Sequence, residues 1–288
     1  MDIAHLKTFL EIYRIRHFGK AAEKLCITQS AASARIKLLE ERLGVKLFTR
    51  ERHAIEATPA GHRFHKYAEM TVSGWEQARV MVALPEQYSQ SLSIGYLPDT
   101  WHLFLKNWVD EIHTQLPETA LNLTIHAGQN VQELILGSAL DVGFVFEPIN
   151  SPRLQSIKVA PLRLQLFSSQ PNMSIEAAMG EGYIMVDWGA MFEYEHSKAF
   201  PELPGSAIRT NYGVMALDLL RVGTRAAYLP DQVANDNVAR NRLYPVEGAP
   251  VFERNLYAVY RSASASIELI EKLIAVITGF GSQTSKPD

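Results

Sequence analysis

A group of polar and basic side chains near the N-terminus has the residue types and the spacing needed to read duplex DNA. The group follows one face of a predicted helix and comprises Thr28, Gln29, Ser30, Ser33, Arg35 and Lys37. Amides and hydroxyls pair with base edges in the major groove, whereas guanidinium and ammonium groups neutralise phosphates. A threonine at the helix start caps the helix and also suits a phosphate. The pattern favours DNA binding over its alternative, a helical hairpin with a solvated polar face.

A preceding short helix must hold this group in place. Ala21, Ala22 and Leu25 give that helix a small apolar face, and Cys26–Ile27 form the turn. The second helix has a predicted buried stripe made of Ala32, Ile36, Leu39 and Leu43. Small side chains let two helices cross closely at a steep angle, which is the geometry of a helix-turn-helix. We interpret Cys26 as a small buried hydrophobic residue rather than a redox sensor.

Two short strands, residues 45–50 and 54–58, are predicted to form a wing around a turn at 51–53. We expect Gln29 and Ser33 to face base edges and Arg35 to contact either guanine or phosphate. We expect Lys20, Lys37 and Arg50 to contact backbone phosphates and Arg52 to enter the minor groove. For Lys20 and Lys37 the alternative is a solvated surface charge without a DNA contact. Residues 1–66 carry a formal charge of +6 and the remainder −9. A basic head on an acidic body is expected when only the head meets phosphate.

Residues 1–58 resemble the winged helix-turn-helix of the LysR-type transcriptional regulators. The segments that carry the resemblance are Leu6–Phe9, Ala21–Ala22, Thr28–Ser33, Leu47–Arg50 and Thr58–Gly61. Within that family, the basic segments at 35–37 and 50–52 are most similar to the HdfR-like branch. One position departs from the pattern: many members carry arginine where this chain has Ala34, so the usual base contact does not transfer there.

The resemblance implies a regulator that binds double-stranded promoter DNA as a homodimer or homotetramer. The branch favours repression, with motility genes as targets, whereas an activator would also contact RNA polymerase. A long helix is predicted to start at Thr58–Pro59 and to reach residues 82–84. The whole segment 59–90 is expected to serve as linker helix and hinge. Its apolar stripe suits pairing with a second helix and comprises Phe64, Tyr67, Thr71, Trp75, Ala78 and Val82. The alternative is a helix that packs only within its own chain.

Beyond residue 91, strands alternate with helices, which predicts a mostly parallel sheet covered on both faces. The predicted strands are 91–97, 120–126, 142–146, 162–168, 183–187, 207–210, 226–229 and 257–260. We place them in two lobes, lobe I at 91–150 and 254–288 and lobe II at 151–253. This α/β arrangement also resembles the effector domain of the family, which is similar to periplasmic solute-binding proteins.

A ligand in such a domain is expected where the carboxyl ends of strands from both lobes meet. That rule selects Tyr96, Pro98, Thr100, Trp101, Gln129, Asn130, Asp187, Trp188 and Tyr212. The ligand class is an unknown small-molecule effector, and the resemblance implies a small carboxylate near Thr100. Asp99 is expected to cap its own helix, and its charge opposes an anionic ligand. A regulator whose cleft is filled by side chains, and which needs no ligand, is the alternative.

Catalysis, cofactors and metals find no support in the sequence. His62 and His65 lie three residues apart without a third ligand, so we expect them to be solvated, and no catalytic residues are proposed. The chain has 288 residues, one cysteine and no apolar run of about 18 residues, which predicts a cytoplasmic protein without a disulfide or membrane span. A cytoplasmic solute-binding module and an α/β enzyme remain the rival interpretations.

Overall fold

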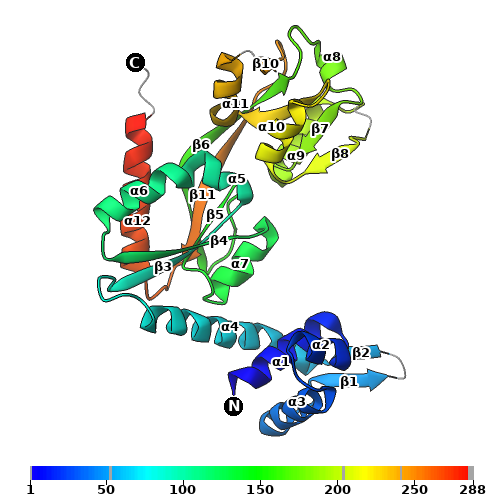
Figure 1. Ribbon diagram of the computed structural model, residues 1–288, viewed down its shortest axis with the longest axis vertical. Helices are drawn as coiled ribbons and strands as arrows, with labels where there is room; N and C mark the ends of the chain where they lie inside the picture. The colour runs from blue at the N-terminus through cyan, green and yellow to red at the C-terminus, as the bar shows by residue number, and fades with distance from the viewer. Residues whose placement is uncertain (1, 52–53, 203–204, 241, 285–288) are drawn as a thin grey trace. The chain divides into compact units, whose positions relative to one another are not determined.

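The computed structural model describes residues 2–51, 54–202, 205–240 and 242–284. It divides into two compact units, residues 1–87 with 133–140 and residues 88–132 with 141–288. Figure 1 labels the helices and strands and colours them by residue number from the N-terminus to the C-terminus. Across the described ranges, no helix has both the length and the hydropathy to cross a lipid bilayer.

The N-terminal head is a winged helix-turn-helix followed by a long helix. Its elements are α1 (Ile3–Ile15), α2 (Phe18–Lys24), α3 (Gln29–Leu43), β1 (Phe48–Glu51), β2 (Ala54–Ala57) and α4 (Pro59–Val82). Strands β1 and β2 pair antiparallel in the register Phe48↔Ala57, as the predicted wing requires. Thr28 caps α3 through its hydroxyl, and Gly44 ends the helix with a φ of 70°, a left-handed conformation that glycine adopts without strain.

The core of the head lies where α1, α2 and α3 cross. Ala21 and Ala32 are fully buried there and allow the close helix crossing that the sequence predicts. Two predicted core positions are wrong. Leu43 is 38% exposed, because the Glu40 side chain turns inward on the last part of α3 instead. Cys26 is exposed, because the turn gives it a φ of 54° and Ile27 takes the inward position.

The start of α4 is joined tightly to the chain segment before the wing. The Thr58 hydroxyl accepts from Gly61 N at 3.0 Å and donates to the Lys46 carbonyl at 2.7 Å. A Cβ on Gly61 would lie 2.2 Å from the Leu47 carbonyl oxygen, so only glycine fits at this crossing. Helix α4 then runs for 24 residues, about 36 Å at a rise of 1.5 Å per residue.

The second unit is built on one nine-stranded sheet with the order β4-β3-β5-β11-β6-β9-β7-β8, and β10 pairs with β6. The strands are β3 (Gln90–Tyr96), β4 (Thr119–Ile125), β5 (Val142–Val145), β6 (Leu154–Ser168), β7 (Tyr183–Val186), β8 (Ile208–Thr210), β9 (Ala226–Pro230), β10 (Tyr244–Pro245) and β11 (Phe252–Arg261). Strands β4, β3 and β5 are mutually parallel in lobe I, and β8, β7 and β9 are parallel in lobe II.

Helices cover the sheet in both lobes. They are α5 (Pro98–Thr100), the π-helix η1 (Trp101–Leu105), α6 (Lys106–Gln115), α7 (Gly128–Leu136), α8 (Ile175–Ala178), α9 (Ala190–Ala199), α10 (Gly213–Leu220), α11 (Asp231–Ala239) and α12 (Ile267–Thr284). In lobe I, α6 and α12 lie together on one face of the strands, whereas α8 to α11 belong to lobe II (Figure 1).

The two crossings between the lobes are longer strands than the sequence predicts. Strand β6 begins at Leu154 rather than at 162, β11 begins at Phe252 rather than at 257, and the two pair antiparallel along their length. Much of the first half of β6 is exposed, including Gln155, Ile157 and Lys158. A search for continuous apolar strands therefore misses it, because such runs mark strands that are buried on both faces.

Candidate nucleic-acid interface and effector cavity

The first turn of α3 is an ordered, polar helix start that faces solvent. The Thr28 hydroxyl accepts from Ala31 N at 3.2 Å and lies 3.0 Å from the Ser30 hydroxyl. Gln29 and Ser30 are exposed beside it. A capped helix start of this kind presents amide donors and the positive end of the helix dipole, which suit a phosphate.

A hollow of about 480 Å³ lies between α3 and the wing. Ser33 and Lys37 line it from α3, and Phe48 and Lys46 line it from β1 and the residues before it. Ala34 also faces the hollow, in place of the arginine common in the resembling family. The structure thus brings Ser33 and Lys37 together with the wing. Lys46 was missed from the sequence, although a lysine just before a predicted wing strand is a usable signal.

Arg35 does not join this surface. Its side chain is half-buried, and its Nη1 donates to the Thr8 hydroxyl of α1 at 3.2 Å. Because Thr8 is fully buried, this bond directs the guanidinium toward the α1–α3 contact. The structure therefore places Arg35 away from Gln29 and Ser33.

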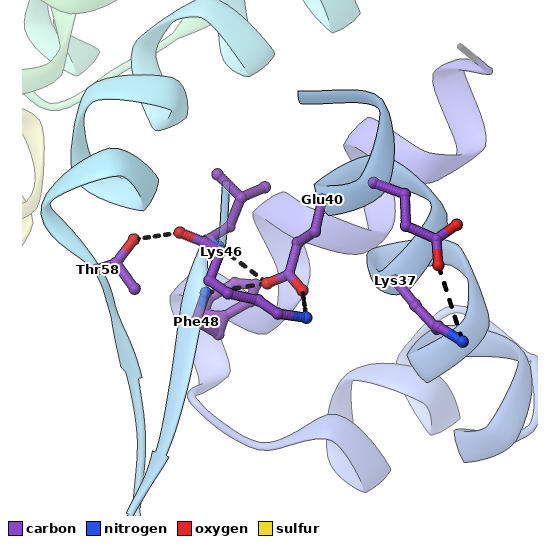
Figure 2. A network of polar contacts seen from close by, with 7 residues as sticks. Lys37, Glu40, Lys46, Phe48 and Thr58 are labelled. Carbon is purple, nitrogen blue, oxygen red and sulfur yellow. Dashed lines mark hydrogen bonds and ion pairs between the residues drawn. The ribbon is translucent and has the colours of Figure 1, made fainter. Parts of the chain in front are cut away.

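The Glu40 carboxylate fixes the wing relative to α3 (Figure 2). It is 8% exposed and accepts from the backbone N of Leu47 at 2.8 Å and of Phe48 at 3.3 Å. The Lys46 ammonium lies 2.7 Å from its other oxygen. The sequence signal for this role is an acidic residue beside the apolar stripe of a helix, four residues after Ile36.

The structure describes the other residues predicted to contact DNA to different extents. Lys20 is exposed on α2, and Lys37 lies 3.7 Å from Glu41. Arg50 pairs through its backbone with Ile55 in the wing, while its side chain lies outside the described atoms. Arg52 lies outside the described residues altogether.

The apolar stripe of α4 divides into two parts. Phe64 packs into the head, with its ring edge-on to Phe9 at a centroid distance of 5.1 Å. The other members are exposed in the single chain, namely Tyr67, Thr71, Trp75, Ala78 and Val82. His62 and His65 also belong to the head, where His62 Nδ1 lies 2.7 Å from the Tyr13 hydroxyl and His65 stacks on the Tyr13 ring.

A cavity of about 730 Å³ opens in the second unit, lined from both lobes. Of the residues predicted for the effector site, three line it: Pro98, Gln129 and Asp187. Other polar residues that line it include Asp99, His126, Glu147 and Asn211. Asp99, His126 and Asn211 lie within three residues of predicted positions, and Glu147 follows β5, a strand whose end the prediction did not use.

The other predicted effector residues do not line the cavity. Trp188 is fully buried, and its Nε1 donates to the Tyr228 carbonyl at 2.9 Å. The Tyr212 hydroxyl lies 3.1 Å from His102 Nε2, and Tyr96 packs near the Trp101 ring. Thr100 is fully buried, and Asn130 is exposed. Successive side chains at a helix start point in different directions around the helix axis. A position just after a strand end therefore does not specify whether a side chain faces the cavity.

Asp99 is the most constrained polar group of the cavity. It does not cap its own helix, as the sequence suggested, but accepts from Gly213 N at 2.8 Å and Val214 N at 3.2 Å, at the start of α10 in lobe II. Burial raises the pKa of Asp99 to about 6, although the two backbone hydrogen bonds act in the opposite direction. A pKa of about 6 leaves the carboxylate mostly ionised at neutral pH, and its hydrogen bonds come from backbone amides rather than from a cationic side chain.

Comparison with known proteins matches both units. Residues 3–62 match the family described as bacterial regulatory helix-turn-helix protein, lysR family, and residues 85–280 match the LysR substrate binding domain. The chain is 34% identical over 284 residues to the HTH-type transcriptional regulator HdfR of Yersinia enterocolitica, covering 95% of each protein.

Two solved structures share the fold. One is full-length CbnR complexed with its target DNA, at 19% identity and a TM-score of 0.64, covering 96% of this chain and 99% of the other. The other is Vibrio fischeri DarR in complex with DNA, at 18% identity and a TM-score of 0.62, covering 96% and 98%. The family matches and the HdfR relative together span nearly the whole sequence. The chain belongs to the LysR family of bacterial helix-turn-helix transcriptional regulators, within its HdfR-like branch.

Proposed function

We propose that this regulator reads promoter DNA with the first half of α3, placing Gln29 and Ser33 at base edges and Thr28 and Ser30 at phosphates. The observation that carries the proposal is the capped, solvent-facing start of α3 beside a hollow bounded by the wing. Polar side chains at the start of a recognition helix reach base edges when that helix enters the major groove.

The basic residues around this surface supply affinity without sequence preference. Lys37 and Lys46 flank the hollow, Lys20 lies on α2, and Arg50 and Arg52 belong to the wing segment. We assign Arg35 a positioning role, because its guanidinium holds α1 against α3 through Thr8. Phosphate neutralisation makes binding depend steeply on salt, whereas base contacts make it depend on sequence.

The assembly proposed is a homodimer or homotetramer that pairs through the exposed stripe of α4, from Tyr67 to Val82. A small molecule in the cavity of the second unit would shift the populations of two arrangements of this assembly and so alter the bound DNA. An activating form would also contact RNA polymerase. The protein acts in the cytoplasm, where the chromosome is.

The test begins with genomic fragments retained by the purified full-length protein, with motility-gene promoters included among them. Fluorescence anisotropy then compares a recovered fragment with a scrambled duplex across a salt series. Gln29→Ala should lose preference at one base pair, about 1–3 kcal/mol. Lys37→Ala should weaken both duplexes alike and reduce the salt slope by about 1.

Lys106→Ala is the matched control, because it removes the same charge from an exposed site in the second unit. It should leave both duplexes unaffected. The proposal fails if the recovered fragment binds no tighter than the scrambled duplex, or if Gln29→Ala weakens both duplexes by the same factor.

A further inference from the structure

Three carboxylates line the cavity of the second unit, and each is bonded to backbone amides of lobe II. They belong to Asp99, Glu147 and Asp187. Two of these side chains, Asp99 and Glu147, come from lobe I and reach across the cavity to the first residues of helices in lobe II. The first turn of a helix offers unpaired amides and positive partial charge, so these are the places where an anionic ligand would be held.

Asp99 fills the start of α10. Its side chain is 2% exposed, and it takes both amide hydrogens of Gly213 and Val214. A Cβ on Gly213 would lie 2.6 Å from the Trp188 ring and 3.3 Å from the Asp99 carboxylate, so the helix start is closed on both sides. The start of α10 is therefore closed around the Asp99 carboxylate, a group that belongs to the protein itself.

Glu147 fills the start of α9 in the same way. Its Oε1 accepts from Met191 N at 2.7 Å, and a Cβ on Gly189 would lie 2.7 Å from that oxygen. Gly189 has a φ of 101°, which strains any residue with a side chain. The amide of Gly189 is taken by Asp187 Oδ1 at 2.9 Å. The two lobe II helices that start at the cavity, α9 and α10, are thus occupied by internal carboxylates.

Nothing basic balances these groups in the cavity wall. Across the described part of the chain, the lining includes neither lysine nor arginine. His126 lines the cavity as well, and burial lowers its pKa, which leaves the imidazole neutral at pH 7. A carboxylate ligand would therefore enter a wall of like charge and find the amides at the starts of α9 and α10 already bonded.

From this arrangement we infer that Asp99 determines the ligand specificity of the cavity: it occupies the start of α10 as a built-in carboxylate, excludes small organic acids and restricts the cavity to uncharged or cationic molecules. The inference rests on the proposed effector role of the cavity. It also means that the lobes are tied across α10 without any ligand, since the side chain and the amides that it binds belong to different lobes.

Acetate tests the inference, because it reproduces the group that Asp99 supplies. The full-length protein and its Asp99→Ala variant are melted in increasing sodium acetate, with sodium chloride at equal ionic strength and the uncharged isostere acetamide as references. Acetate should not raise the Tm of the wild type above chloride. It should raise the Tm of Asp99→Ala by about 2–4 °C at roughly ten times its Kd, with acetamide inactive.

Glu147→Gln is the matched control, because it removes one negative charge from the same cavity but leaves Asp99 on α10. It should not respond to acetate. An equal acetate response in the wild type, in Glu147→Gln and in Asp99→Ala would overturn the inference, and so would a response of Asp99→Ala to acetamide alone. The absence of any acetate response in Asp99→Ala would overturn it too.

Asp99→Ser provides a second opened variant, since serine is tolerated in the first turn of a helix. If both variants are recovered unfolded, refolding in acetate against chloride gives the same readout, and failure of acetate to restore the fold counts against the inference. The measurement uses neither DNA nor a natural effector. Loss of DNA preference in the anisotropy assay and loss of the acetate response are therefore separate outcomes.

Discussion

The Glu40 carboxylate on α3 accepts a hydrogen bond from the backbone amide of Leu47 at 2.8 Å. This bond joins the recognition helix to the first residues of the wing, and Phe48 N adds a second at 3.3 Å. Since Leu47 is fully buried, its amide has no access to water. The Glu40 side chain thus sets the spacing between α3 and the wing, although it lies within the helix, seven residues before Leu47.

Replacing Glu40 by alanine should destabilise the head. Two backbone amides would lose their acceptor in a buried place, which costs about 2–4 kcal/mol. Denaturant unfolding of the full-length protein measures the loss, and hydrogen exchange at Leu47 and Phe48 locates it. Glu41→Ala is the control, because Glu41 is exposed and lies 3.7 Å from Lys37. A stability equal to that of Glu41→Ala would show that the carboxylate does not hold the wing.

Two glycines of α4 should respond in opposite directions to alanine. A Cβ at Gly61 would lie 2.2 Å from the Leu47 carbonyl oxygen, whereas a Cβ at Gly74 would meet nothing within 4 Å. Gly74→Ala should therefore stabilise the helix by roughly 0.5–1 kcal/mol through reduced chain entropy. Gly61→Ala should destabilise the head, since the neighbour is backbone. Thermal melts of the two variants decide the matter, and equal shifts would contradict the close crossing of α4 and Leu47.

Acid pH should affect the second unit through two groups with opposite signs. Burial lowers the pKa of His196 to about 4, so its contribution is present above pH 6.5 and is lost as the pH falls toward 4. Burial raises the pKa of Asp99 to about 6, so its contribution is present below pH 3.8 and is lost as the pH rises through 6. Each window of about two pKa units corresponds to about 3 kcal/mol.

Asp99→Asn should separate these two effects. Without the acid of Asp99, the free energy of unfolding should fall more steeply between pH 6.5 and 4 than in the wild type. The difference between the two proteins should change by about 2 kcal/mol across the window from pH 6 to pH 4. Chemical denaturation at half-unit pH steps measures it. Parallel pH profiles would mean that Asp99 titrates as it does in the unfolded chain.

Trp75 tests the pairing face of α4. It is 49% exposed in the single chain, on the same stripe as Val82 at 89%. Trp75→Glu should weaken self-association by at least about tenfold, because a charge replaces a buried aromatic anchor at an interface. Sedimentation of DNA-free protein gives the assembly state. Lys66→Glu, on the opposite side of α4, should sediment as the wild type does; a Trp75→Glu variant that also does so would remove this face from the interface.

Local signals in the sequence were sufficient for the elements of the head. The capping hydroxyls of Thr28 and Thr58 and the glycine after Leu43 mark helix ends through bonds that lie within a few residues. The same reasoning could not show where Arg35 points, because its acceptor Thr8 lies on another helix, 27 residues away. Helical periodicity also cannot tell that Glu40 rather than Leu43 faces inward.

The sequence was sufficient to locate the cavity but not to specify the contacts made by its side chains. Strand ends specify the place where lobes meet, and Pro98, Gln129 and Asp187 lie there. The pairing of Asp99 with Gly213 joins residues 114 apart, across two lobes, and no local pattern encodes it. From the sequence, the nearest partner expected for Asp99 is the start of its own helix.

The ladder between β6 and β11 has a mechanical consequence. Two flexible loops would let each lobe swing freely, whereas these strands are hydrogen-bonded to each other and lie within the one sheet that runs through both lobes. Rearrangement of the lobes must then proceed as torsion of a shared ribbon. Its register shifts between Leu256 and Tyr257, an irregularity at which antiparallel ribbons coil more strongly. We therefore expect the ribbon to twist most at this step when the lobes rearrange.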